Sequence, residues 1–194
     1  MQVIEKTKNN EVAGSVAARP GGRSARIQAA IFKAVEELRQ APDGPDMTVP
    51  AIAARAGVTP STIYRRWGSL NELLAQVAAK NLRPDAPPEA TGDWRKDLEI
   101  WLHQFVEEMS SEPGRAMLRE VLGGEREENA GQCSAYTRQQ LDAILDRAGD
   151  GSQAPTTDKL LDGVIAPVMY RILFTSAAPD HDYACALLQR TLEA

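Results

Sequence analysis

The chain has 194 residues, 43% of them hydrophobic, and its 27 acidic and 22 basic side chains give a net charge of -5. This length predicts one domain or two small ones that bury enough surface to need no covalent staple. The two cysteines, Cys133 and Cys185, exclude a disulfide framework and a four-ligand cysteine metal site, so a reducing cytoplasm is the expected location.

A membrane-spanning segment is not expected. No stretch free of Asp, Glu, Lys and Arg exceeds nine residues, whereas a spanning helix needs about 20 apolar positions. The first 18 residues carry charges with no apolar block behind them, which is not the pattern of a secretory signal.

The charge is divided unequally along the chain. Residues 1–83 hold 12 basic and 7 acidic side chains, while residues 84–194 hold 10 basic and 20 acidic ones. The acidic total argues against nucleic acid as a partner, but the division reverses that argument. It predicts a small basic module that meets phosphate, joined to a larger acidic module that repels it.

The first half predicts an arm followed by four helices. Residues 1–22 are polar, lack periodicity and end in Arg-Pro-Gly-Gly, so we expect a mobile arm or a tail without function. Apolar residues at helical spacing predict a first helix from Ser24 to the Ala-Pro-Asp-Gly-Pro segment at 41–45. Three short helices follow, with these start signals: Thr48; Thr59 before Pro60; and Ser69 with Glu72 as a capping box.

A break at 83–92, which contains three prolines, separates a module at 23–83 from a second one at 84–194. Helical periodicity in the second module predicts five further helices and one charged loop. The helices are expected at 94–109, 113–122, 133–149, 157–175 and from Pro179 onward, and the loop at 123–131. No strand pattern of useful length occurs, so the fold class is all-α with about nine helices.

The stretch from Thr48 to Trp67 predicts a helix-turn-helix. Such a motif requires a small residue where two helices cross, a turn residue with positive φ and apolar residues that lock the second helix. Ala53, Gly57, Val58 and Ile63 provide these at offsets of four, five and ten residues from Ala53. The alternative is an ordinary helical hairpin.

The outer face of the helix that begins at Pro60 indicates what the motif binds. If Ile63 and Trp67 point inward, the outward residues are Pro60, Ser61, Thr62, Tyr64, Arg65 and Arg66. Hydroxyl groups bond base edges or phosphates, a tyrosine hydroxyl bonds a phosphate oxygen, and an arginine pairs bidentately with guanine. The alternative is a solvated polar face.

Residues 23–80 resemble the N-terminal DNA-binding domain of the TetR repressor family. The matching residues, in order, are the apolar stripe of the first helix, Thr48, Ile52-Ala53, Ala56-Gly57-Val58, Thr62-Ile63-Tyr64-Arg65, Trp67, Ser69 and Leu73-Leu74. The resemblance implies a homodimer that places one recognition helix per subunit in successive major grooves of a palindromic double-stranded DNA operator. It also implies phosphate contacts for Thr48 and Tyr64 and base contacts for Ser61, Thr62 and Arg65. A fourth helix would join the DNA-binding module to the ligand-sensing module.

One position departs from the family pattern. Family members usually carry a lysine just after the residue equivalent to Ser69, where it contacts phosphate, but this chain has Leu70 there. The missing charge is expected from Arg66 or from Arg19, Arg23 and Arg26 near the arm. Thr59 and Pro60, at the start of the recognition helix, complete the expected DNA-binding surface.

The second half resembles the family only in outline. Its Pro167, Tyr170 and Arg171 are similar to a Pro-x-x-Tyr-Arg segment in the penultimate helix of one TetR subgroup. The family implies that the last two helices form a four-helix bundle with their partners in the homodimer. The broad apolar surface of the 157–175 helix independently favours burial on two sides, with a monomeric core helix as the alternative.

We expect a small apolar effector to bind inside the second half. The expected function is that of a repressor that leaves its DNA when this effector binds. The residues expected near it are Trp101, Phe105, Met109, Met117, Tyr136 and Met169. The alternative for each of them is plain core packing. The acidic charge of this half favours a neutral or cationic apolar molecule.

An enzyme is the alternative of another class, and the sequence offers it little. His103 has Glu99 and Glu107 one turn away on either side, and His181 lies between two aspartates; both are interpreted as solvated surface. The two cysteines have no nearby histidine in sequence and are expected to pack as small hydrophobic residues. We therefore expect no catalytic residues, cofactor or metal. A helical ligand-binding protein that never meets DNA is the third alternative, and it leaves Arg65 and the charge division unexplained.

Overall fold

The computed structural model describes residues 22–41, 46–149 and 153–193, and within these ranges the chain is helical with no strand. Counting the contiguous segment 157–174 as one helix and η1 as the last turn of α7 gives nine helices in these ranges, which agrees with the prediction. The elements are α1 (Arg23–Gln40), α2 (Val49–Ala56), α3 (Pro60–Trp67), α4 (Leu70–Asn81), α5 (Trp94–Ser110), α6 (Glu112–Leu122), α7 (Glu127–Leu145), η1 (Asp146–Ala148), α8 (Thr157–Leu160), η2 (Leu161–Ile165), α9 (Ala166–Phe174) and α10 (His181–Glu193). No helix in the described ranges has the length and apolarity that crossing a membrane requires.

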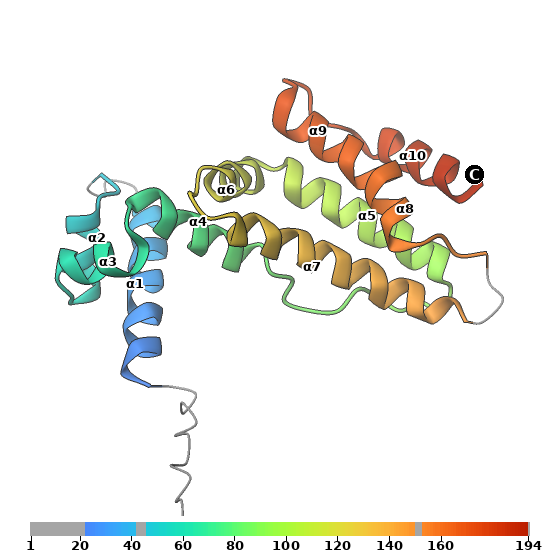
Figure 1. Cartoon of the computed structure of the whole chain (residues 1–194). Helices are drawn as coiled ribbons and strands as arrows, with labels where there is room; N and C mark the ends of the chain where they lie inside the picture. The colour runs from blue at the N-terminus through green and yellow to red at the C-terminus, as the bar shows by residue number, and fades with distance from the viewer. Residues whose placement is uncertain (1–21, 42–45, 150–152, 194) are drawn as a thin grey trace, which may run out of the picture.

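The helices α1 to α4 share one hydrophobic core. The apolar stripe of α1 contributes Ile31 and Val35, and α2, α3 and α4 contribute Ile52, Ile63 and Leu73, all fully buried. Because apolar residues recur at helical spacing in each of these four helices, each helix has one apolar face, and that face packs on this core. Figure 1 shows α1, α2 and α3 together at one end of the molecule, with α4 leading away from them.

The helices α5 to α10 enclose a second, larger core. Leu98 and Leu102 of α5, Leu141 and Ile144 of α7 and Val168 of α9 are among its buried residues. The break predicted at 83–92 lies in the extended segment 82–93 between α4 and α5. This segment therefore connects the two cores.

The charged loop predicted at 123–131 is wrong for its second part, because α7 begins at Glu127. Two acidic side chains, Glu127 and Glu128, lie in the first turn, where the helix dipole stabilises negative charge. Gly131 lies inside α7 without ending it, since the packing of the helix outweighs the roughly 1 kcal/mol that a helical glycine costs.

The segment from Thr157 to Phe174 is one helix with an irregular turn. Thr156 caps its start through a hydrogen bond from the Lys159 N–H. The residues 161–165 have π-helical geometry just before Pro167, whose ring nitrogen has no hydrogen to donate to the preceding turn. This turn packs tightly on α10, because a Cβ added at Gly163 would lie 2.5 Å from the Thr191 hydroxyl oxygen.

The last helix begins later than predicted. Pro179 lies two residues before α10 and is buried, and the start signal is Asp180, whose carboxylate accepts a hydrogen bond from the Tyr183 N–H. An aspartate in this position satisfies an N–H that has no partner within the helix.

A buried carboxylate joins the two cores. The predicted capping box is half correct: the Ser69 hydroxyl accepts the Glu72 N–H at 3.2 Å, but the Glu72 side chain points away from it. Glu72 is 2% exposed, and its carboxylate accepts the backbone N–H groups of Glu125 and Arg126 at 3.0 and 3.2 Å and the Asn129 amide at 2.8 Å. A side chain of α4 thus caps the start of α7.

Around Glu72 the two halves pack closely. A Cβ added at Gly124 would lie 2.7 Å from the Ala75 Cβ on α4 and 3.3 Å from a Glu72 carboxylate oxygen. The Arg39 guanidinium of α1 pairs with Glu120 of α6 nearby. The loop between α6 and α7 therefore lies directly against the helix that leaves the first core.

We expect Glu72→Ala to lower the free energy of unfolding by about 1–3 kcal/mol, because it leaves buried N–H and amide donors without an acceptor. Urea unfolding followed by far-ultraviolet circular dichroism measures this. Glu125→Ala is the matched control, since the exposed Glu125 side chain lies in the same loop and only its backbone N–H bonds Glu72. Equal effects of the two substitutions would contradict the structural role of the Glu72 carboxylate.

Candidate nucleic-acid interface and ligand cavity

The turn between α2 and α3 has the predicted geometry. Gly57 adopts φ 68°, a left-handed conformation that a residue with a Cβ rarely takes, and its N–H together with that of Val58 bonds the last carbonyls of α2. The Thr48 hydroxyl caps the start of α2 by accepting the Ala51 N–H at 3.3 Å. Because it accepts there, its own hydrogen remains able to donate to another group.

The helix α3 is locked to the first core by the two residues predicted to point inward. Ile63 is fully buried and Trp67 is 4% exposed. The Trp67 indole N–H donates to the Gln76 side chain on α4 at 2.7 Å, and its ring lies 6.2 Å from that of Phe32 on α1. These contacts fix which face of α3 meets solvent.

The opposite face of α3 is exposed and polar. Pro60, Ser61, Tyr64 and Arg65 are exposed, with Tyr64 at 51%. Thr62 is half-buried, and its hydroxyl lies 3.0 Å from that of Thr59. The surface combines hydroxyl groups at the start of the helix with an arginine one turn further on.

The predicted cap of α3 is only partly correct. Thr59 occupies the N-cap position with extended backbone, but its side chain accepts no helix N–H. Its hydroxyl instead lies 2.9 Å from the Ser61 hydroxyl and 3.0 Å from that of Thr62. The sequence indicated the position of Thr59 but could not show that three hydroxyl groups meet at the start of α3.

Arg66 is engaged within the protein. Its guanidinium donates to the Ser24 carbonyl at 2.9 Å and to the Ser24 hydroxyl at 2.7 Å, which ties α3 to the start of α1. Arg23 and Arg26 lie exposed beside this contact, whereas Arg19 and the arm residues 1–21 lie outside the described residues. Of the residues expected to replace the missing lysine charge, Arg23 and Arg26 remain exposed.

Leu70, at the position where the family carries lysine, is the first residue of α4 and packs against the first core. Its side chain thus contributes apolar contact and no charge at this position.

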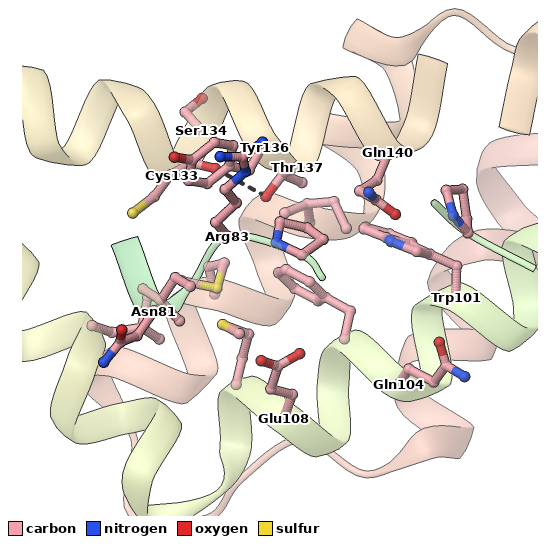
Figure 2. A pocket seen from close by; sticks show the side chains of 18 of the residues that line it. Asn81, Arg83, Trp101, Gln104, Glu108, Cys133, Ser134, Tyr136, Thr137 and Gln140 are labelled. Atoms are coloured by element: carbon pink, nitrogen blue, oxygen red, sulfur yellow. Dashed lines mark hydrogen bonds between the residues drawn. The ribbon is translucent and has the colours of Figure 1, made fainter. Parts of the chain in front are cut away.

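A cavity of about 700 Å³ lies in the second half, between α5, α6, α7, α9 and the segment 81–89 (Figure 2). Five of the six residues expected near a ligand line it: Trp101, Phe105, Met109, Tyr136 and Met169. Met117 is not among the lining residues, because this side chain packs on the cluster formed by Ala78, Ala79 and Val121. The neighbouring Leu118 lines the cavity, so Met117 lies on the other side of α6, toward α4.

The segment between α4 and α5 forms a wall of the cavity that sequence reasoning treated only as a break. Residues from Asn81 to Glu89 line the cavity. We refer to residues 82–93 as the strap. Its three prolines were the signal that could have indicated a defined, non-helical wall, because proline restricts φ.

A buried ion pair holds the end of the strap. Asp97 of α5 is 1% exposed and accepts the Thr91 N–H at 2.8 Å, the Thr91 hydroxyl at 2.7 Å and the Arg147 guanidinium at 2.9 Å. Arg147 also donates to the Pro88 carbonyl at 2.8 Å and to that of Glu89. The strap is therefore tied to α5 and to the short helix η1 that follows α7.

The interpretation of Cys185 as a cysteine without a nearby histidine is wrong. His181 lies four residues earlier, one helical turn away, and the Cys185 Sγ is 3.3 Å from its Nε2. The His181 ring also contacts that of His103, with centroids 4.5 Å apart. Burial and the nearby carboxylates of Glu99 and Asp182 raise the pKa of the Cys185 thiol, which disfavours the nucleophilic thiolate.

Within the described ranges, no group of three His, Cys, Asp or Glu side chains is arranged to hold a metal ion. His103 is 52% exposed and lies 3.9 Å from the Glu107 carboxylate. It therefore faces solvent, as the sequence indicated, although His181 packs against it.

Comparison with known proteins covers both halves of the chain. The family model "Tetracyclin repressor-like, C-terminal domain" matches residues 88–191, and the model "Bacterial regulatory proteins, tetR family" matches residues 41–77. The HTH-type transcriptional regulator Rv1556 of Mycobacterium tuberculosis is 30% identical over 156 residues, which cover 73% of this chain and 74% of Rv1556.

Two further proteins are similar. The HTH-type transcriptional regulator AqdR of Rhodococcus erythropolis is 29% identical over 68 residues, 35% of this chain and 33% of AqdR. The crystal structure of the TetR family transcription regulator SCO0332 is similar with a TM-score of 0.62 and 25% identity, covering 87% of this chain and 97% of SCO0332.

The strap anchor predicts a pH dependence. Hydrogen bonds from Thr91, helped by Arg147, hold the pKa of Asp97 below its ordinary value of 3.8 and outweigh the opposite effect of burial. A lowered pKa in the folded state contributes stability above the ordinary pKa, and this contribution is lost as the pH falls through the folded-state value. We expect Asp97→Asn to lower the unfolding midpoint most at neutral pH, with a difference from the parent protein that shrinks below about pH 3.8.

Thermal unfolding across a pH series measures this difference. Asp85→Asn is the control, since Asp85 is an exposed carboxylate of the same strap, and its effect should be small at every pH. An Asp97→Asn difference that does not change with pH would contradict this role of the carboxylate charge.

Proposed function

Since the chain belongs to the TetR family of transcriptional regulators, we propose that it is a repressor that binds a palindromic operator as a homodimer and releases it when a small molecule binds. The family is one of DNA-binding regulators and not of enzymes. The main support for the proposal is the orientation of α3. Ile63 and Trp67 are buried in the first core, so the polar face of α3 is exposed to solvent.

In this proposal α3 enters the major groove. Arg65, exposed and one turn beyond the hydroxyl cluster, pairs with a guanine edge. Ser61 and Thr62 contact neighbouring bases, and Thr59 and Pro60 place the start of the helix at the groove. The internal bonds of Arg66 to Ser24 give it a positioning role, since they hold α3 against α1.

Phosphate contacts come from the residues around α3. The Tyr64 hydroxyl, on a side chain 51% exposed, and the Thr48 hydroxyl at the start of α2 are suited to donate to phosphate oxygens. Arg23 and Arg26, exposed at the start of α1, supply charge that Leu70 does not. Each phosphate neutralised adds about 0.9 to the salt dependence of binding.

The exposed face of α9 supports the homodimer. Val168 and Ile172 face the second core, while Tyr170 and Phe174 on the other side are 63% and 72% exposed and lie 5.3 Å apart. Burying two large aromatic rings is favourable, and a two-fold interface places each pair against the same surface of the second subunit. We therefore assign the dimer contact to the segment 157–174 and α10.

The cavity supports the sensing role. The strap that lines the cavity follows directly from α4, and Asn81 at the end of α4 also lines it. A molecule in the cavity would therefore contact the end of α4, which belongs to the first core. A ligand that favours one position of α4 over another alters DNA affinity, with a typical coupling of about 1–3 kcal/mol. Trp101, Phe105 and Met169 are the proposed apolar contacts.

Gel-shift titration on the DNA that flanks the gene tests the function, and we expect sequence-preferring binding that weakens as salt rises. Arg65→Ala should weaken operator binding by about 1–3 kcal/mol and relax the preference at one base position. Lys96→Ala is the control, because Lys96 is an exposed cation of α5 outside the helix-turn-helix. Absence of sequence preference in the parent protein would refute the proposal, and an equal loss on all sequences would make Arg65 a phosphate contact.

The dimer is tested by replacing Tyr170 and Phe174 together with lysine. Two charges in an apolar interface should weaken association by about a hundredfold or more, since buried aromatic residues commonly contribute more than 2 kcal/mol each. Sedimentation velocity at micromolar concentration measures the shift from dimer to monomer. Leu122→Lys, which places a charge at another exposed apolar residue, should leave the dimer intact. If the double variant and Leu122→Lys have the same effect on association, the dimer interface does not involve Tyr170 and Phe174.

A further inference from the structure

The cavity has an aromatic wall with one carboxylate beside it. Trp101 and Phe105, one turn apart on α5, stack with ring centroids 5.1 Å apart and an interplanar angle of 23°. Leu161, Ile165 and Met169 line the cavity from the segment 157–174. A volume of about 700 Å³ is within the range of sites that hold a drug-sized molecule. The volume and the aromatic lining suit a molecule with a flat aromatic ring.

The charge of the cavity lining is negative. Its charged residues are one cation and three carboxylates: Arg83, Asp85, Glu89 and Glu108. All four are exposed; three of them belong to the strap, and Glu108 lies on α5, one turn after Phe105. Figure 2 shows the Glu108 carboxylate directed toward the space between α5 and α7, with Arg83 on the opposite side near Tyr136.

Glu108 has no ion-pair partner among the described residues, whose eight ion pairs involve other side chains. Glu108 is exposed, so its attraction for a cation is that of a pair at a protein surface, where the effective dielectric constant is still below that of water. The faces of Trp101, Phe105 and Tyr136 add attraction for a positive charge. These groups all favour the same sign of ligand charge.

Hydrogen bonding favours the same chemistry. The Gln140 side chain uses an amide N–H on the Ala86 carbonyl of the strap, and the Thr137 hydroxyl donates to the Cys133 carbonyl. Both side chains line the cavity and retain acceptor oxygens, and Gln140 also keeps its second amide N–H. A ligand that carries N–H groups matches these acceptors and the Glu108 carboxylate.

We propose that the cavity binds an organic cation, a flat aromatic molecule with a protonated amine, whose ring packs on Trp101 and Phe105 and whose ammonium group pairs with Glu108. The proposal rests on the proposed function, in which the second half senses a small molecule, and it adds the chemical class of that molecule. Glu108 is the residue that selects the charge, because the aromatic wall by itself accepts a neutral ring equally well.

The test uses three fluorescent probes that share one ring system and differ in charge: anthracenylmethylammonium, anthracenemethanol and anthracenecarboxylate. Each is titrated into the purified full chain without DNA. We expect the ammonium probe to bind at least tenfold more tightly than the alcohol and the carboxylate to bind most weakly. Equal affinities, a preference for the carboxylate, or no binding of any probe would overturn the proposal.

Glu108→Gln keeps the shape of the side chain and removes its charge. We expect it to weaken binding of the ammonium probe at least tenfold and to change binding of the alcohol less than twofold. Glu107→Gln is the matched control, since this neighbouring carboxylate of α5 faces His103 outside the cavity lining. If both variants weaken the ammonium probe equally, general surface charge and not Glu108 selects the cation.

The outcome is distinguishable from failure of the proposed function. Because the probe titrations contain no DNA, they report on the cavity even if the protein fails to bind an operator. Gel shifts with the parent protein report on DNA binding separately, because α3 belongs to the first core and Glu108 to the second half. If the parent protein does not bind DNA, the proposed function is refuted. If the cavity does not distinguish the probes by charge, only the proposal of a cationic ligand is refuted.

Discussion

The position of α3 relative to the cavity depends on how the carboxylate of Glu72 is satisfied. Glu72 belongs to α4, yet its hydrogen-bond donors are the backbone of the α6–α7 loop and the Asn129 side chain. A buried carboxylate without such donors costs several kcal/mol, so the loop and α4 stay together in the folded protein. The positive end of the α7 dipole adds to this attraction. The Glu72 side chain thus holds the start of α7, which lines the cavity, against α4, which belongs to the first core.

Two more contacts extend this junction toward the DNA-binding surface. The Arg126 side chain donates to the Arg66 carbonyl at the end of α3, and the Arg66 side chain bonds Ser24 at the start of α1. The chain of contacts therefore runs from α7 through the loop to α3 and α1. A displacement of α7 by a ligand would act on α3 through these polar contacts as well as through α4.

The cavity depends on a different constraint, which is the path of the strap. The segment between α4 and α5 runs along the cavity, and its three prolines disfavour a helix there. Asp97 and Arg147 tie the end of the strap. With Trp101, Phe105 and Glu108 on the facing helix, the strap encloses a space whose lining combines aromatic rings with negative charge. The strap links the first core to the cavity, because it follows directly from α4 and forms a cavity wall.

The sequence by itself determined the fold class, most helix boundaries and the DNA-binding motif, because these depend on local signals. Apolar periodicity placed Ile63 and Trp67 inside, and Gly57 and Thr48 act at the turn and cap that their residue types predict. Five of the six residues expected near a ligand line the cavity, since large apolar side chains on inward helix faces are those that a cavity exposes.

Only the tertiary structure decided which partner each polar side chain takes. Glu72 fits a local capping box but bonds residues more than 50 positions away, and Arg66 fits a DNA contact but bonds Ser24. Met117 turns toward α4, and His181 of α10 packs on His103 of α5. The physical reason is that a long polar or flexible side chain has several partners of similar energy within reach. The choice among them depends on which helices pack together, and the local sequence does not contain that information.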